Sequence, residues 1–574
     1  MTAITVSTAI ATGRVDLANA RRKALLTAQV RALWVIAAFM LIGLVALGRI
    51  VWLGIEQPAP RGEDLASALL PPRGDIVDRN GVTLARAFPG IALWYDPKAM
   101  GEGAPLVHTP REVARALVAI FPDMNEAELT RRLASGKAGY LRRRILPEDA
   151  NRIRDIGEPA LEFPRESERY YPQGSMGAHV LGYVDAEGHG QVGMEQVYDK
   201  LLADPATRGT PAMLSIDSRV QGALEDELLK GMALSNAKGA SGIVLDVNTG
   251  EVIALASLPS FNPNLIDQGG AGNIFNRFTN QVYELGSVMK PITIAAAIDA
   301  GVVTSMAKRY PAVSPLMIDG FPIHDHENYG STLNVPETLI HSSNIVSAEI
   351  GAELGGARLR QTMISLGFNQ RPTIELPARG FPLWPRGDWA KITTMTVSFG
   401  HGLAITPLHI ASAYAALVNG GIWHPATLHK VEPGTTIPGR RVFKDSTSAR
   451  MRQLLRLIVD DGTGRKANAP GFRIGGKTGS AEKPGAHGYQ KNAVVATFAS
   501  AFPMDNPRYV VIASLDEPQG TAATSGQRTA AWNAAPVVGR LVPRIGPLLG
   551  VMPDTTRDID IRELMPLVGN SEGE

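Results

Sequence analysis

The chain has no cysteine among its 574 residues. This absence excludes disulfide bonds, thiolate metal sites and a cysteine nucleophile, although it does not distinguish a reducing compartment from an oxidising one. The net charge is only +2, so the composition gives no indication of nucleic-acid binding. Hydrophobic residues make up 44% of the chain and charged residues 20%, which are the proportions of a folded protein. We find no internal repeat and no low-complexity tract.

Long apolar runs are absent, with one exception near the N-terminus. Residues 32–47 are all apolar, and the run continues past Arg49 to residue 53. A stretch of about 20 apolar residues is enough to cross a hydrocarbon core of roughly 30 Å. Trp34 and Trp52 stand near its two ends, where aromatic side chains favour the membrane interface. We therefore predict a transmembrane helix over residues 32–53.

The segment before this run has Asp16 as its single acidic residue. Its basic residues are Arg14, Arg21, Arg22, Lys23 and Arg31. The positive-inside rule predicts that residues 1–31 stay in the cytoplasm and that the rest of the chain lies beyond the membrane. A cleaved signal peptide is the alternative. Because the segment ahead of the run is long for a signal peptide, we expect a retained, single-pass anchor.

Two regions of different character follow a polar linker over residues 54–69. In the first, residues 70–211, Asn80-Gly81 is a strong turn signal between short apolar runs, and few residues suggest chemistry. The second, residues 212–552, contains the motifs described below. The chain ends in a charged tail, residues 553–574, which we expect to be loosely packed.

Strand and helix patterns follow a definite order within the second region. Its five strand-like runs cover residues 241–247, 251–257, 472–481, 494–502 and 509–515. A long, mainly helical stretch separates the second run from the third, and a helical pattern returns after the fifth. This order predicts an α+β fold in which a five-stranded antiparallel sheet is covered by helices and has a large helical insertion.

Ser287 and Lys290 offer a hydroxyl nucleophile and an amine on one face of a helix. Good helix sequence continues after Pro291, which places Ser287 near the positive end of the helix dipole. A buried Lys290 would lose its proton readily and serve as a general base. The alternative is a helix cap followed by a surface lysine.

Two further motifs follow along the chain. Ser342-Ser343-Asn344 stands before another helical stretch and offers a hydroxyl and an amide, although a serine there is also a common N-cap. Lys477-Thr478-Gly479 lies in a strand with several glycines, which often mark the close approach of another backbone. A peptide substrate could pair with such an edge strand. Alternatively, the lysine only protects that edge from association.

The three motifs are weak alone and specific together, because their order and their elements agree with one Ser/Lys acyl-transfer site. That chemistry needs no histidine, metal or cofactor, and we expect neither metal nor cofactor. His324-Asp325-His326-Glu327 offers donor atoms for a metal but lacks a further clustered ligand. For His341 and His401, which lie near the motifs, we expect structural or hydrogen-bonding roles.

With these motifs the chain resembles the class B penicillin-binding proteins, membrane-anchored serine D,D-transpeptidases of peptidoglycan. Further motifs that support the resemblance are Tyr283-Glu284-Leu285-Gly286, Gly400-His401-Gly402, Thr406-Pro407, Asn419-Gly420-Gly421 and, in the first region, Arg73 to Gly81, Arg169 to Gly182 and Gly193 to Glu195. The resemblance implies an elongated pedestal domain over residues 70–211 and a penicillin-binding transpeptidase domain over residues 212–552.

The resemblance also implies a role for each motif residue. Ser287 would attack the penultimate D-Ala carbonyl of a stem peptide ending in D-Ala-D-Ala, Lys290 would accept its proton, and Ser342 would relay a proton to the leaving amine. Lys477 would add catalytic positive charge, and the backbone amides of Ser287 and Ser480 would form the oxyanion hole. The residues implied in binding the donor are Asn344, Thr478, Gly479 and Ser480. An amine from a neighbouring stem would then form the cross-link, and β-lactams would acylate the same serine.

Leu285 and Ser480 depart from the family, where proline and threonine are common. Because Ser480 keeps the hydroxyl, we expect an altered substrate or β-lactam fit. Residues 91–98 resemble the division-specific FtsI type, and the elongation-specific type is the alternative. The resemblance further implies a bacterial inner-membrane protein at the division septum. Its catalytic domain would lie outside the cytoplasm, and its partners would be a SEDS-family glycosyltransferase (FtsW-like) and other division proteins.

A non-catalytic β-lactam sensor or a division scaffold is the alternative from a different functional class. The intact motifs argue against a vestigial site, and a sensor normally has further membrane helices. A soluble β-lactamase conflicts with the predicted anchor and pedestal.

Overall fold

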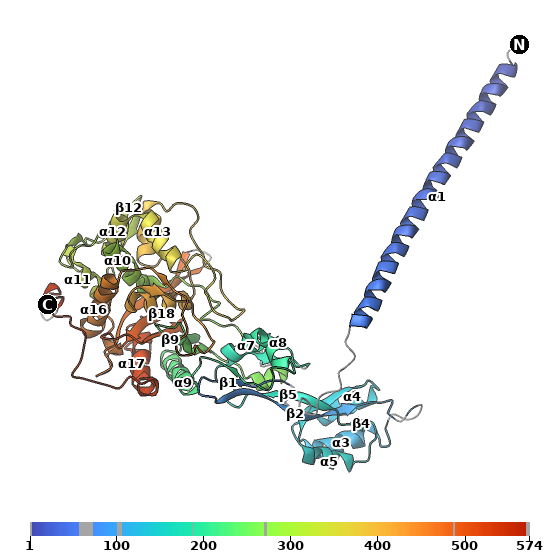
Figure 1. Ribbon diagram of the computed structural model, residues 1–574, viewed down its shortest axis with the longest axis horizontal. Coiled ribbons are helices and arrows are strands. Elements are labelled where there is room, and N and C mark those ends of the chain that lie inside the picture. The colour runs from blue at the N-terminus through green and yellow to red at the C-terminus, as the bar shows by residue number, and fades with distance from the viewer. Residues whose placement is uncertain are drawn as a thin grey trace. The chain divides into compact units, whose positions relative to one another are not determined.

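The computed structural model describes residues 3–56, 73–99, 101, 106–185, 187–268, 273–485 and 488–569. The chain divides into two compact units, Met1–Leu70 and Pro71–Glu574, and each is described by itself (Figure 1). Most of the predicted linker over residues 54–69 lies outside the described residues.

The first unit contains a single described helix, α1 (Ala3–Glu56). Within it, Leu25–Arg49 has a mean hydropathy of 2.4 and is long enough to cross a membrane. The apolar side chains of this stretch are exposed in the helix, with Trp34 at 73% and Phe39 at 71%. Because removing apolar surface from water is favourable, such a helix is stable when lipid surrounds it. The stretch overlaps the predicted span and fits a single-pass anchor.

The second unit begins with the pedestal, which contains a six-stranded sheet. Its longest strand is β2 (Thr83–Tyr95), and the predicted Asn80-Gly81 turn connects β1 to it. The other strands are β1 (Ile76–Val77), β3 (Gly139–Ile145), β4 (Leu161–Glu162), β5 (Arg165–Tyr170) and β8 (Ala212–Met213). Three helices pack beside it: α3 (Pro110–Ile120), α4 (Glu126–Ala134) and α5 (Pro147–Arg154).

The buried residues of the pedestal belong to two separate apolar cores. Leu93, Leu117 and Leu133 belong to a core of the outer part, made by β2–β4 and helices α3–α5. In contrast, Tyr171 and Met194 belong to the main core of the transpeptidase region. We call this second part the base of the pedestal. It consists of short elements: α6 (Ala178–Leu181), β6 (Tyr183–Val184), β7 (Gly190–Val192), α7 (Gly193–Val197) and α8 (Asp199–Ala203). The base of the pedestal is therefore continuous with the region that contains the three motifs.

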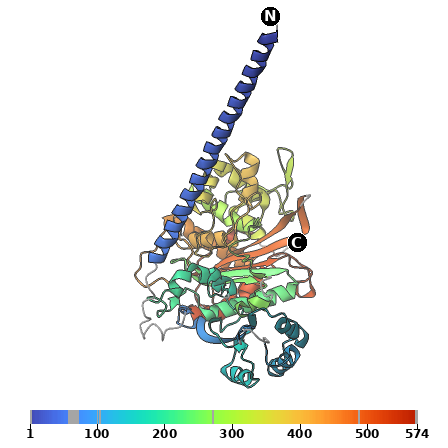
Figure 2. The ribbon, with the colours of Figure 1, turned by 90° about the vertical axis from the view of Figure 1, so that its right-hand side faces the viewer.

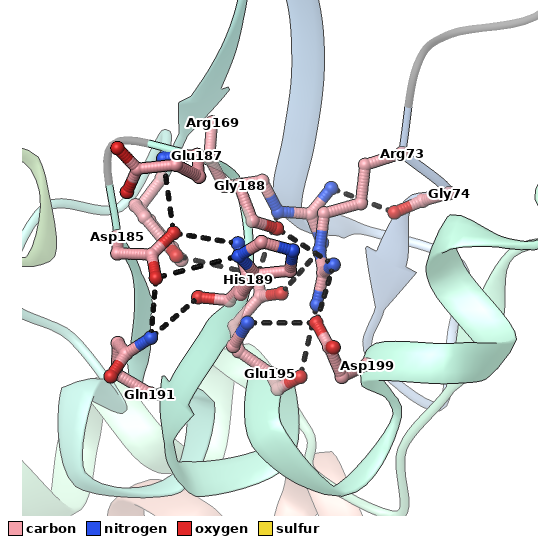
Figure 3. Close-up of polar contacts among 12 residues, drawn as sticks. Arg73, Gly74, Arg169, Asp185, Glu187, Gly188, His189, Gln191, Glu195 and Asp199 are labelled. Atoms are coloured by element: carbon pink, nitrogen blue, oxygen red, sulfur yellow. Dashed lines mark hydrogen bonds and ion pairs between the residues drawn. The ribbon is translucent and has the colours of Figure 1, made fainter. Parts of the chain in front are cut away.

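A buried ion network holds the pedestal base together (Figure 3). Glu195 is fully buried and accepts hydrogen bonds from Arg73 Nε at 2.9 Å and from Arg169 Nε at 2.6 Å. Arg73 also donates to Asp199 at 2.8 Å, and Arg169 donates to the Gly74 carbonyl at 2.7 Å. The pedestal motifs that are far apart in the sequence therefore meet at one carboxylate.

The transpeptidase region is built on a five-stranded, fully antiparallel sheet, in the order β10-β9-β19-β18-β17. The strands are β9 (Gly239–Asp246), β10 (Val252–Leu258), β17 (Gly475–Gly485), β18 (Gly488–Phe502) and β19 (Tyr509–Asp516). Strands from both ends of the region lie side by side, green beside orange-red in Figure 2. The predicted sheet is confirmed, and β17 is one of its edges.

Helices cover both faces of this sheet. One core contains α9 (Ser218–Ser235) and α17 (Ala534–Ile545), which lie together in Figure 1. The other core contains the long insertion between β10 and β17. Its helices are α10 (Lys290–Asp299), α11 (Val335–His341), α12 (Asn344–Leu354), α13 (Gly356–Ser365), α14 (Lys391–Ser398), α15 (Pro407–Val418) and α16 (Asp445–Asp461). Short strand pairs also lie in the insertion: β11 (Tyr310–Pro311) with β14 (Thr332–Leu333), β12 (Leu316–Ile318) with β13 (Phe321–Ile323), and β15 (Ile422–Trp423) with β16 (Arg440–Arg441).

The described part of the C-terminal tail, residues 553–569, packs against the transpeptidase region. Arg456 of α16 pairs with Asp558 at 2.8 Å, and Leu564 and Val568 are buried in the main core. The expectation of a loosely packed tail is wrong here, because isolated apolar residues anchor an otherwise charged segment.

We predict that Glu195→Ala destabilises the pedestal base strongly. Removing this carboxylate leaves the guanidinium groups of Arg73 and Arg169 buried without their shared anion, which costs about 3–5 kcal/mol of unfolding free energy. Calorimetry of the detergent-solubilised chain should show a lower unfolding transition. Arg562→Ala, which breaks an exposed pair with Asp560, is the control and should leave the transition unchanged. Equal behaviour of the two variants would contradict the assigned role of the network.

Candidate active site

The first motif lies on a tight turn that leads into a buried helix. Residues Gly286–Met289 form a 3₁₀ turn, and α10 begins at Lys290. Ser287 is half-buried on this turn, whereas Lys290 has no exposed surface. Tyr414 of α15 donates a hydrogen bond to the Val288 carbonyl at 2.9 Å and fixes the turn from the core side. The turn therefore presents the Ser287 hydroxyl while the following lysine points into the protein.

The second motif contains a serine in an unusual conformation. Ser342 lies between α11 and α12 with φ 65° and ψ 41°, in the left-handed region. Ser343 is the N-cap of α12, and its hydroxyl accepts a hydrogen bond from the Val346 amide at 3.1 Å. The predicted N-cap serine is therefore Ser343, which leaves the Ser342 side chain available for the site.

The Ser342 hydroxyl lies between the two lysines. Lys290 Nζ donates to Ser342 Oγ at 3.1 Å and also to the Ser342 carbonyl. Lys477 Nζ donates to the same Oγ at 2.9 Å and to the Thr478 carbonyl at 3.1 Å. Lys477 has no exposed surface either. One lysine from each of two motifs thus converges on a hydroxyl from the third.

Burial makes both lysines weaker bases than usual. It lowers the pKa of Lys477 to about 7. The pKa of Lys290 is well below its ordinary value, first because of burial and second because of the charge of Lys477, while the charge of Asp325 opposes this shift. Burial acts on both groups, and the charge of Lys477 acts on Lys290 in addition. The site therefore disfavours the state in which both lysines are charged.

Strand β17 packs directly against the turn that contains Ser287. A Cβ atom at Gly479 would lie 2.5 Å from the Leu285 carbonyl oxygen and 2.9 Å from Val288 Cγ1, so only glycine fits there. The glycines of this strand predict that another backbone comes close to it, and that backbone is the turn around Ser287 in the same chain. Gly286 of that turn lies against the Ser480 carbonyl, with its Cβ position 3.2 Å away, so the backbones of Ser287 and Ser480 are near neighbours.

The remaining predicted residues make contacts within the protein. Asn344 donates through Nδ2 to the His324 carbonyl at 2.9 Å. Thr478 Oγ1 shares a hydrogen bond with Thr463 Oγ1 at 2.8 Å. Ser480 is exposed, and its hydroxyl accepts a hydrogen bond from the Ala530 amide at 2.9 Å. Ser480 therefore connects the edge strand to the segment before α17.

The structure does not join every predicted pair. Within the described residues, no hydrogen bond joins the Ser287 hydroxyl to either lysine, and both lysines bond to Ser342 instead. Catalytic hydrogen bonds are often loose without substrate, so this geometry is compatible with a Ser/Lys site.

Two carboxylates near the site, Asp325 and Glu284, lie in motifs noted in the sequence, but the sequence did not assign them contacts in the site. Asp325 accepts hydrogen bonds from the second motif, although its neighbours in the sequence suggested only a weak metal-binding pattern. Glu284 accepts from the Tyr489 hydroxyl at 2.7 Å and from the Gly402 amide at 2.8 Å, beside His401. Burial lowers the pKa of His401, so its imidazole is neutral at pH 7. Only the folded chain brings these residues to the site.

Comparisons with known proteins agree with this geometry. The family model described as the penicillin binding protein transpeptidase domain matches residues 240–537, and the penicillin-binding protein dimerisation domain matches residues 68–210. The probable peptidoglycan D,D-transpeptidase FtsI of Caulobacter vibrioides is 38% identical over 87% of this chain and 85% of its own. Escherichia coli FtsI is 30% identical over 92% of this chain and 93% of its own.

A solved structure shows the same fold. The chain superimposes on penicillin-binding protein 3 of Mycobacterium tuberculosis, complexed with ampicillin, with a TM-score of 0.67 at 24% identity. The match covers 86% of this chain and 99% of that one. The chain belongs to the class B penicillin-binding proteins and is related to the FtsI-type peptidoglycan D,D-transpeptidases.

Proposed function

We propose that this chain is a peptidoglycan D,D-transpeptidase that cross-links stem peptides through an acyl-enzyme on Ser287 and is a target of β-lactams. One observation supports this most: the Ser342 hydroxyl lies within hydrogen-bond distance of two buried lysines, beside the turn with Ser287. An amine that is neutral near pH 7 is a competent base for a serine hydroxyl.

In the acylation half, Ser287 Oγ attacks the carbonyl carbon of the penultimate D-Ala. Its proton passes to the neutral amine of Lys290, and the carbonyl oxygen gains negative charge opposite the Ser287 and Ser480 amides. The bond from the carbonyl carbon to the nitrogen of the terminal D-Ala then breaks. Ser342 relays the proton from Lys290 to that nitrogen, so free D-Ala leaves and the acyl-enzyme remains.

In the second half, an amine from a neighbouring stem attacks the acyl-enzyme. Its nitrogen bonds to the carbonyl carbon, the bond to Ser287 Oγ breaks, and the proton lost by the amine returns to Ser287 through the same relay. Asn344, Thr478 and the backbone of Gly479 and Ser480 position the donor, and charged Lys477 attracts its carboxylate. A β-lactam enters the first half in the same way, but its leaving group stays attached.

The cellular setting is part of the proposal. Residues 1–31 lie in the cytoplasm, the helix α1 anchors the chain, and the catalytic region lies beyond the inner membrane. The 38% identity to an FtsI relative supports a role in division over one in elongation. A SEDS-family, FtsW-like glycosyltransferase and other division proteins are the partners proposed for the anchor and the pedestal.

Fluorescent penicillin should label the wild-type chain in membranes, and Ser287→Ala should abolish that labelling, because no other hydroxyl is proposed as the nucleophile. Labelling is read by fluorescence after denaturing electrophoresis. Ser446→Ala, which changes an exposed serine of α16, is the control and should label fully. An unlabelled wild-type chain would refute the catalytic proposal, and a labelled Ser287→Ala chain would refute the choice of nucleophile.

The acylation rate should rise and then fall with pH. Lys290 must be neutral to accept a proton, so the rate increases as the pH rises through its lowered pKa. Lys477 must be charged, so the rate decreases as the pH rises through its pKa of about 7. Stopped-flow acylation by a chromogenic β-lactam measures both limbs.

The variant Lys477→Arg separates the two limbs. Arginine keeps its charge throughout this pH range, so the falling limb should disappear even if the maximal rate is low. A falling limb that stays near pH 7 in this variant would contradict the assignment to Lys477.

A fluorescent protein fused ahead of residue 1 should gather at mid-cell in dividing cells, because it would fold in the cytoplasm and follow the anchor. Microscopy of the Ser287→Ala fusion tests whether placement depends on catalysis. A uniform lateral distribution of the wild-type fusion would refute the division role.

A further inference from the structure

The loop after β13 reaches the second motif from outside the elements that contain the three motifs. Asp325, two residues beyond β13, accepts a hydrogen bond from the Ser343 hydroxyl at 2.6 Å. Its other carboxylate oxygen accepts from the backbone amides of Asn344 and Ile345, the latter at 3.1 Å. One carboxylate thus satisfies the first amides of α12, which have no partner within the helix.

Two more residues of this loop contact the same motif. The His324 carbonyl accepts from Asn344 Nδ2 at 2.9 Å. The Tyr329 ring stacks on His341, the residue before Ser342, with ring centroids 4.9 Å apart and planes at 19°. The loop therefore contacts the chain on both sides of Ser342. We refer to His324, Asp325 and Tyr329 together as the clasp.

Ser342 needs such support because of its backbone. A residue with a side chain in the left-handed region costs about 1–2 kcal/mol and persists only when the surroundings enforce it. If Ser342 relaxed, its hydroxyl would leave the position between Lys290 and Lys477. The residue that both lysines contact therefore has a backbone conformation that is unfavourable by itself.

We propose that the clasp is a positioning element for acylation, in which Asp325 and Tyr329 hold Ser342 in its left-handed conformation and so keep its hydroxyl between the two lysines. The proposal rests on the proposed function, because it assigns a role in that same reaction. A simple helix cap would stabilise α12 without affecting the reaction, and this difference can be measured.

Asp325 has an electrostatic effect as well. The groups that act on Lys290 are Lys477 on β17, which lowers its pKa, and Asp325, which raises it. His401, on the turn after α14, is also close enough to Lys290 that the charge of Lys290 lowers the pKa of His401. Loss of the Asp325 charge therefore lowers the pKa of Lys290 further. The rising limb of the acylation profile should then move to lower pH.

The test measures acylation by a chromogenic β-lactam against pH, with thermal unfolding, on the full-length chain in detergent. Asp325→Ala should slow acylation about 100-fold, the effect typical of a misplaced catalytic group. Asp325→Asn keeps the shape and one acceptor oxygen, so it should slow acylation less and shift the rising limb to lower pH. Tyr329→Ala should slow acylation, whereas Tyr329→Phe, which keeps the stacked ring, should retain the wild-type acylation rate.

Asp217→Asn is the matched control. Asp217 is a buried N-cap of α9 in the same region, so this variant should lower the unfolding temperature but leave the rate and the pH profile unchanged. If the Asp325 variants behave like this control, the clasp is only a helix cap and the proposal is overturned. If the wild-type chain is not acylated at all, the proposed function fails, and the clasp proposal fails with it.

Discussion

The site depends on one constraint: two lysine amines are buried around a single serine hydroxyl. Lys290 and Lys477 have no exposed surface, and their hydrogen-bond partners are the hydroxyls of Ser342 and Thr478 and two backbone carbonyls, none of them charged. Keeping two ammonium groups in such a place is unfavourable, so at least one amine gives up its proton. The unfavourable burial is therefore also what would supply the base of the proposed reaction.

The fold makes this burial possible. The sheet supplies an edge strand whose Gly479 lets β17 touch the turn that contains Ser287, and the insertion supplies Ser342 at the junction of α11 and α12. Two large cores, one on each face of the sheet, hold these parts at fixed distances. Close-packed cores tolerate a costly site because their stability exceeds its cost. The packed cores on the two faces of the sheet therefore support the elements that contain the three motifs.

Local sequence signals predicted much of this arrangement. The strands, the start of α10 and the N-cap before α12 follow from alternation, helix patterning and serine chemistry, and the three motifs predicted one site. The left-handed Ser342 was not predictable, because a serine there has no local cause for it. Asp325 and Tyr329 were missed because their contacts cross a loop. The packed tail was missed because Leu564 and Val568 have no periodic pattern around them. Contacts between distant residues leave no period in the sequence.

The protonation of the two lysines at neutral pH tests the central claim most directly. Lysine labelled with ¹³C at Cε reports its charge through its chemical shift, and Lys290→Arg and Lys477→Arg variants assign the two signals. The central claim predicts that Lys290 titrates well below its ordinary pKa of 10.5 and that Lys477 titrates near pH 7. Ammonium shifts for both lysines at pH 7, with titration near the ordinary value of 10.5, would contradict it.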